Sequence, residues 1–187
     1  MKQNEQQIMT DCKHVPSEDK MTIKRIEPAR IEELPSFMLA GISAVTTNEA
    51  ELSKDGKIGK LFEQFHSQNI GKKLGVNIQE NGHYSCYFNY EQGDAGHYEI
   101  MVSVRIQEAL QLQNLDMIKA FTVPAAKYAV FVTERGPIIE MVQRTWADIW
   151  QWSQQPGNNR AFTGDFEYYS KDINPEDGQA EIYISIK

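Results

Sequence analysis

The chain repeats one order of secondary structure elements. Apolar periodicity predicts strand, strand, helix, strand, strand in about residues 21–110 and again in about residues 115–187. The closing strands share a string, because Glu99–Val104 reads EIMVSV and Glu181–Ile186 reads EIYISI. Such a match favours internal duplication over chance. The sequence therefore predicts an α+β fold of tandem duplicated β-β-α-β-β units, in which two antiparallel sheets form a pseudo-twofold lobe pair with a central ligand cleft.

Two kinds of apolar spacing define the expected elements. A helix that ends near Gly71 is predicted by apolar residues at i, i+3, i+4 and i+7: Ile58, Leu61, Phe62 and Phe65. A second helix is expected between the Gly-Pro pair at 136–137 and the Pro-Gly pair at 156–157. Alternation predicts strands at 22–27, 83–90, 98–106 and 182–186. Further strands are expected at 37–46, 118–121, 128–132 and 162–168.

Composition excludes several classes of protein. The chain has 187 residues and a formal net charge of −7, which gives no electrostatic reason for direct nucleic-acid binding. No apolar run approaches the ~20 residues that span a bilayer. Two cysteines, Cys12 and Cys86, are too few for a disulfide scaffold. Residues 1–20 are polar and are expected to be a flexible leader. They contain no apolar segment typical of a secretory signal and are not expected to form a helix-turn-helix. A cytoplasmic protein is therefore expected.

Four short motifs, in this order and spacing, carry a resemblance to a known family: Leu34-Pro35, Trp146-x-x-Ile149-Trp150, Phe166-Glu167-Tyr168 and Glu181–Ile186. With them the chain resembles the GyrI-like (gyrase-inhibitor-like) small-molecule-binding domain, which is also the effector-binding domain of some AraC-type and MerR-type transcription activators. The resemblance covers about residues 21–187 and implies one effector-binding domain there.

The resemblance also implies a site. Members of the family bind lipophilic, often cationic compounds in the cleft between the repeats, and some hydrolyse small electrophilic compounds. The family's key carboxylate falls on Glu167. Asn89 stands at the matching position of the first repeat, so one carboxylate is expected to enter the cleft from this pair.

Physical chemistry supports the same role for Glu167. A carboxylate among aromatic rings loses part of its hydration, so it favours cations that are themselves apolar and lose little hydration on entry. Aromatic faces add cation–π attraction of about 0.5–2 kcal/mol each. The alternative is that Glu167 points to water from an edge strand, as an isolated strand glutamate usually does.

Aromatic side chains near these motifs are the candidate cleft walls. For any single one, packing in the core is the open alternative, because a tryptophan stripe at helical spacing is first of all the face of a helix on a sheet. Trp146 and Trp150 share one face of their helix, and Trp152 turns away from it. The candidates are Trp146, Trp150, Tyr87, Tyr90, Tyr168, Tyr169 and Tyr183.

Metal and cofactor sites are not expected. His83 and Cys86 have an H-x-x-C spacing, but no second pair of ligands lies nearby in the sequence. A G-x-S-x-G nucleophile elbow is absent, and the GKIGK string lacks the spacing of a phosphate-binding loop.

Three functions remain. The first is a stand-alone cytoplasmic binding protein for lipophilic, chiefly cationic small molecules such as drugs or effectors. The second is a hydrolase of small electrophiles, with Glu167 as base or nucleophile and Tyr90, Tyr168 or Tyr183 as the acid. The third is a protein-interaction modulator of DNA gyrase or of transcription, although the acidic residues form no long block.

Overall fold

The computed structural model describes residues 26–76, 78–107 and 117–187. In this part of the chain eight strands form one antiparallel sheet, in the order β1-β6-β8-β7-β3-β4-β2-β5. The strands are β1 (Arg30–Leu34), β2 (Phe37–Thr46), β3 (His83–Phe88), β4 (Tyr98–Ile106), β5 (Lys119–Val123), β6 (Ala126–Val132), β7 (Asp165–Tyr169) and β8 (Glu181–Ile186).

The prediction of two separate sheets is wrong, because β3 pairs with β7 and joins the two halves of the chain. The first strand of each half is also exchanged: β1 pairs with β6, and β5 pairs with β2. A β7 left unpaired on that side would expose a row of backbone donors and acceptors, and pairing with β3 satisfies them. The α+β class is confirmed, with a single curled sheet in place of two.

Several predicted boundaries also need correction. The expected strand at 22–27 lies partly outside the described residues, and the first observed strand begins at Arg30. The first long helix ends at Ser67 rather than near Gly71, because Asn69 adopts a left-handed conformation with φ of 51°. Phe162, with φ of 56°, precedes β7 instead of belonging to it.

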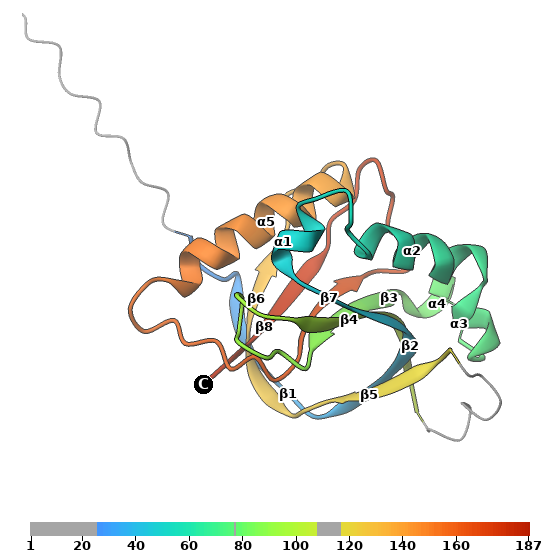
Figure 1. The fold of residues 1–187 in the computed structure, drawn as a ribbon, viewed down its shortest axis with the longest axis horizontal. Coiled ribbons are helices and arrows are strands. Elements are labelled where there is room, and N and C mark those ends of the chain that lie inside the picture. Colours follow the sequence, from blue (N-terminus) through green and yellow to red (C-terminus); the bar gives the residue numbers. More distant parts are fainter. Residues whose placement is uncertain (1–25, 77, 108–116) are drawn as a thin grey trace, which may run out of the picture.

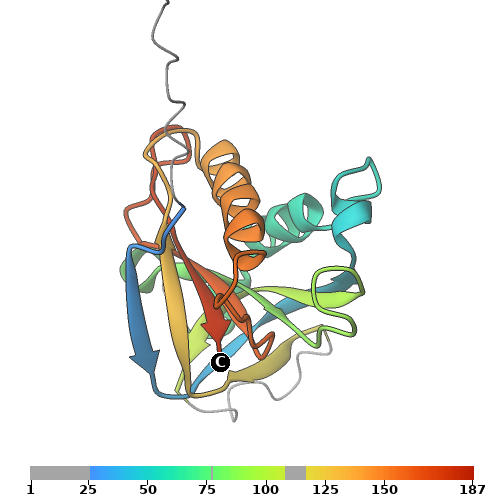
Figure 2. The ribbon, with the colours of Figure 1, turned by 90° about the vertical axis from the view of Figure 1, so that its left-hand side faces the viewer.

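Within the described ranges five helices accompany the sheet: α1 (Asn48–Glu51), α2 (Ile58–Ser67), α3 (Ile70–Lys73), α4 (Ile78–Asn81) and α5 (Ile138–Ser153). Figures 1 and 2 show α2 and α5, the two long ones, on the same face of the sheet. Their apolar stripes explain this placement, since Leu61 and Phe65 of α2 and Ile149 and Trp152 of α5 are buried. None of these helices is long and apolar enough to cross a membrane.

Both faces of the sheet are buried. The inner cluster joins residues of the central strands, such as Phe166 and Cys86, to Val123 of β5 and to Leu34 of β1. Because β1 and β5 are the two ends of the sheet, this packing shows that the sheet curls around the inner cluster. Two outer clusters lie under α2 and α5. The outer face between these two helices is where the candidate site lies.

Candidate functional site

A cavity of about 1070 Å³ opens on the helix-bearing face of the sheet. Its walls come from α1 and α2 on one side, α5 on the other, and its floor from β3 and β7. This volume is at the upper end of the range for small-molecule sites. The residues used below are part of its lining: Phe62, His66, His83, Tyr87, Tyr90, Asp94, Tyr98, Trp146, Trp150, Arg160, Glu167 and Tyr169.

Glu167 lies on the floor of this cavity and is only 2% exposed. One carboxylate oxygen accepts hydrogen bonds from the Tyr87 hydroxyl at 2.8 Å and from the Trp146 indole N–H at 2.6 Å. The other oxygen accepts from the Tyr169 hydroxyl at 2.6 Å. All three groups donate, which suits the charged form of the carboxylate.

The donors around Glu167 are neutral. Burial, and secondly the charge of Glu167, raise the pKa of Tyr87 and of Tyr169 well above the usual phenol value, so both hydroxyls keep their protons. Among the ion pairs of the described residues, none involves Glu167. A buried charge is ordinarily paired with an opposite one, so this carboxylate is an exception.

The aromatic walls are packed against one another. The Tyr87 and Trp146 ring centroids lie 5.2 Å apart, edge to face, and Trp146 and Trp150 lie 6.4 Å apart. His83 stacks on Tyr169 with centroids 4.8 Å apart and an angle of 7° between the rings. These contacts fix the three donors around Glu167 before any ligand arrives.

Two histidines complete this wall in their neutral form. The rings of His83 and His66 meet edge to face at 5.3 Å. Burial, and secondly the neighbouring His66, lower the pKa of His83 to about 4. Burial also lowers the pKa of His66. At neutral pH neither ring supplies a positive charge to Glu167.

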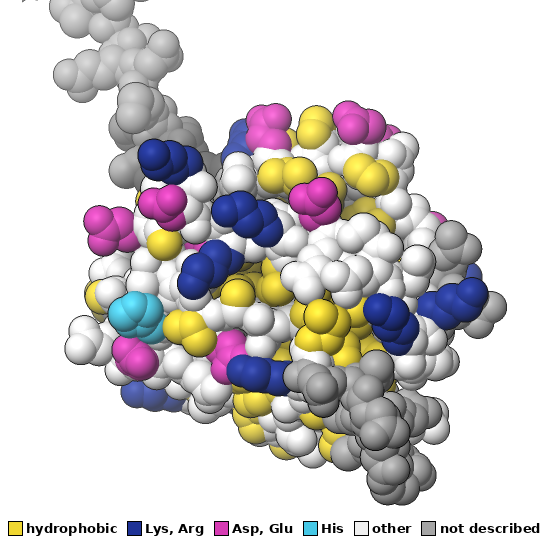
Figure 3. Space-filling view, turned by 45° about the vertical axis from the view of Figure 1, so that its right-hand side comes forward, with side chains coloured by type: hydrophobic (Ala, Val, Ile, Leu, Met, Phe, Trp, Pro, Cys, Tyr) yellow, Lys and Arg dark blue, Asp and Glu magenta, His cyan; other side chains and the backbone are white. Residues whose placement is uncertain are grey.

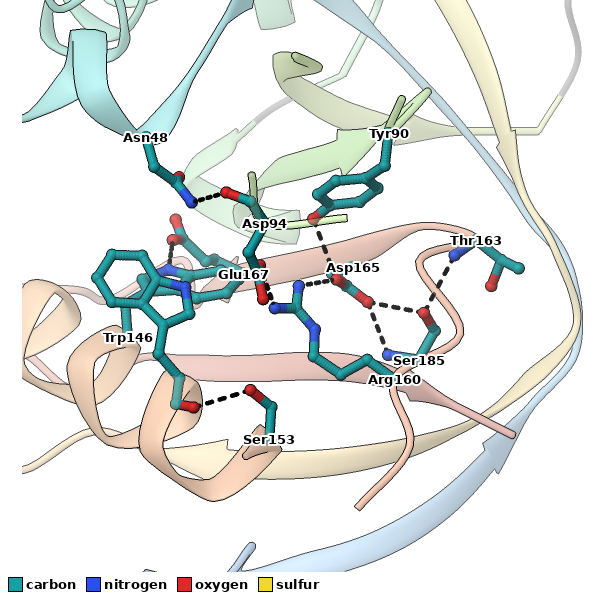
Figure 4. A network of polar contacts seen from close by, with 11 residues as sticks. Asn48, Tyr90, Asp94, Trp146, Ser153, Arg160, Thr163, Asp165, Glu167 and Ser185 are labelled. Atoms are coloured by element: carbon teal, nitrogen blue, oxygen red, sulfur yellow. Dashed lines mark hydrogen bonds and ion pairs between the residues drawn. The ribbon is translucent and has the colours of Figure 1, made fainter. Parts of the chain in front are cut away.

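Arg160 is the buried cation of the cavity wall, which Lys54 and Lys171 also line, and two carboxylates other than Glu167 bind it. Its guanidinium donates to Asp94 at 2.5 Å and to Asp165 at 2.6 Å, and it lies 4.3 Å from the Phe162 ring centroid. Figure 4 shows this network beside Glu167. Asp165 is fully buried and also accepts from the Tyr90 hydroxyl and from the backbone N–H of Ser185.

The cavity brings together most of the residues singled out from the sequence: Glu167, Trp146, Trp150, Tyr87, Tyr90 and Tyr169. Tyr168 and Tyr183 lie on the other face of the sheet, where both belong to the inner cluster. Side chains alternate along a strand, so Tyr168 points away from its neighbour Glu167, and Tyr183 lies beside Phe166. Asn89 is exposed at the end of β3 and is not part of the lining.

Sequence reasoning missed Arg160, Asp94 and Asp165. Asp165 had a usable signal, because it stands two residues before Glu167 and a strand places such residues on the same face. Arg160 and Asp94 come from loops 66 residues apart, and no local pattern joins them.

Within the described residues no group of three or more potential ligands is placed to hold a metal ion. His83 and Cys86 are three positions apart along β3, which is an odd interval. The two side chains therefore lie on opposite faces, with His83 in the cavity wall and Cys86 in the inner cluster.

A family model described as integron-associated effector binding protein, Cass2, matches residues 30–186. The chain belongs to this family. The resemblance to GyrI-like effector-binding domains is thereby confirmed. A curated relative of this chain is Bacillus subtilis YobU, classed provisionally as a transcriptional regulator. It is 33% identical over 165 residues, which are 85% of this chain and 98% of YobU.

Solved structures of similar proteins share the fold of this Cass2 chain. The integron cassette protein VCH_CASS2 from the mobile metagenome of Vibrio cholerae is 28% identical, with a TM-score of 0.69 over 84% of this chain and 95% of its own. SAV2435, solved with bound tetraphenylphosphonium, is 19% identical, with a TM-score of 0.68 over 84% of this chain and 93% of its own.

Proposed function

We propose that this Cass2-family protein binds lipophilic organic cations in the cavity above Glu167. The observation that carries the proposal is a carboxylate 2% exposed, held by three neutral donors and without an ion-pair partner among the described residues. A ligand cation supplies the missing opposite charge. A lipophilic cation does so at the least cost, because it loses little hydration when it leaves water.

The walls of the cavity support this choice. An apolar ligand body would meet the aromatic rings of four lining residues: Trp146, Trp150, Tyr87 and Tyr90. Cation–π attraction adds about 0.5–2 kcal/mol for each ring whose face meets the positive charge. The volume of about 1070 Å³ admits a bulky ligand. SAV2435, which shares the fold, was solved with tetraphenylphosphonium, a cation of this kind.

Three phenyl-bearing probes of different charge test the proposal by isothermal titration calorimetry. Tetraphenylphosphonium is a cation, tetraphenylborate is an anion, and triphenylphosphine oxide is neutral. We expect tetraphenylphosphonium to bind at least tenfold more tightly than either of the others, because only the cation gains from the charge of Glu167. Equal affinity for the phosphonium and the borate would refute a role for that charge.

The two other functions inferred from the sequence stay predictions. In a hydrolase Glu167 would act as base or nucleophile, yet each of its oxygens here accepts a hydrogen bond from an aromatic donor. A gyrase or transcription partner would need a binding surface. On the face drawn in Figure 3 acidic and basic side chains are interspersed rather than gathered by sign.

A further inference from the structure

Strand β7 presents two carboxylates to the helix-bearing face, and the two have different partners. Asp165 and Glu167 are two residues apart, so their Cα atoms lie about 6.6 Å apart along the strand. Asp165 binds the protein's own cation, Arg160, whereas Glu167 accepts hydrogen bonds from neutral groups. An arginine and an unpaired carboxylate thus line the same cavity without forming an ion pair.

Two carboxylates hold Arg160 in this position. Asp94 and Asp165 each accept from a different terminal nitrogen of the guanidinium. The guanidinium also lies 5.9 Å from the Trp146 ring centroid, and Trp146 is a hydrogen-bond donor to Glu167. Within the described residues the Arg160 Nε is buried without a partner, so this side chain keeps a donor that another acceptor can use.

We propose that Asp165 and Asp94 are specificity-determining residues, which keep Arg160 away from Glu167 and so preserve the preference of the cavity for cations. The inference rests on the proposed function. It extends that function to two residues that bind Arg160 and do not bind the ligand themselves. Asp165, Asp94 and Arg160 are positioning residues in this scheme.

The local charges give the direction of the effect. Within the set of Glu167, Asp165, Asp94 and Arg160, three negative charges and one positive charge leave a net charge of −2. Glu51, Lys54 and Lys171 also line the cavity and are unchanged in the variants below. Burial raises the pKa of the Tyr98 phenol, and Glu51, Glu167 and Asp94 raise it further, so Glu167 and Asp94 both lie within electrostatic reach of this wall residue. Without Asp165, Arg160 loses one of its two ion-pair partners and keeps Asp94. Glu167, on the same face of the sheet, then becomes an alternative partner for the guanidinium.

The test compares wild type, Asp165→Asn and the double variant Arg160→Gln/Asp165→Asn with the phosphonium and borate probes. We expect Asp165→Asn to weaken tetraphenylphosphonium binding by about tenfold or more and to strengthen tetraphenylborate binding. The double variant removes the released arginine and restores a net charge of −2. We expect it to bind tetraphenylphosphonium within about threefold of wild type.

A purely structural role of Asp165 predicts a different pattern, in which both probes bind more weakly and the double variant recovers neither. That pattern, or wild-type affinity in Asp165→Asn, overturns the inference. Should Asp165→Asn fail to fold, as judged by circular dichroism, Asp94→Asn replaces it, because the Asp94 side chain is 34% exposed. The expected loss with this variant is about threefold, and wild-type affinity overturns the inference.

The proposed function fails in a separate way. If wild type binds no tetraphenylphosphonium, both proposals fall. If wild type binds it and the affinity depends on Glu167, but the Asp165 and Asp94 variants bind as wild type does, the assignment of these two residues alone is wrong.

Discussion

Replacement of Glu167 by glutamine is expected to lower the affinity for tetraphenylphosphonium roughly 100-fold. Two unit charges about 6 Å apart interact by about 3 kcal/mol at an effective dielectric constant of about 20, and the substitution removes this attraction. Glutamine has nearly the same shape. Its carbonyl oxygen can still accept from Tyr87 and Trp146, and its amide NH2 then faces the Tyr169 hydroxyl, which can accept a hydrogen bond as well as donate one. Affinity for neutral triphenylphosphine oxide is therefore expected to change less than about threefold. Calorimetric titration of both probes measures the two effects.

Glu99→Gln is the matched control for this experiment. Glu99 of β4 is another buried carboxylate of the same sheet and accepts hydrogen bonds from Ser43, Asn89 and Lys119. It is not part of the cavity lining. We expect Glu99→Gln to bind tetraphenylphosphonium as wild type does. A loss of equal size in the two variants would show that the effect comes from the sheet and not from the charge in the cavity.

Long strands were predictable, whereas strand partners were not. The intervals 37–46 and 98–106 agree with β2 and β4, because each is a long apolar stretch of ten or nine residues bounded by polar segments. The exchange of β1 and β5 between the halves was invisible in the sequence. Each of these strands has five residues, and its partner depends on how the whole sheet curls.

The candidate site was predictable where a motif and a period-two pattern both applied. Glu167 came from the resemblance, and Trp146 and Trp150 from helical spacing. Strand alternation favours Tyr169 over Tyr168 as a neighbour of Glu167, and the structure agrees with it. Asp165 had a signal in its place two residues before Glu167, but its pairing with Arg160 and Asp94 had none, because those two residues come from separate loops that only the folded sheet brings together.

Acidification is expected to destabilise the protein through His83. Its pKa is about 4 in the folded protein and 6.5 in the unfolded chain, because burial disfavours the charged ring. Between these values the unfolded chain binds a proton that the folded protein does not. The contribution of His83 to the free energy of unfolding is therefore complete above pH 6.5, falls as the pH falls below it, and levels off near pH 4, with a total loss of about 3 kcal/mol.

His83→Phe isolates this contribution, since phenylalanine keeps an aromatic ring beside Tyr169, Phe62 and His66 but binds no proton. Urea unfolding of both proteins gives the difference in their free energies of unfolding. We expect this difference to shift in favour of the variant by about 2 to 3 kcal/mol between about pH 7.5 and about pH 4.5. A difference that does not change with pH would mean that His83 takes up its proton in the folded protein as readily as in the unfolded chain. The wall beside Glu167 would then carry a positive charge in acid, which the buried stack on Tyr169 argues against.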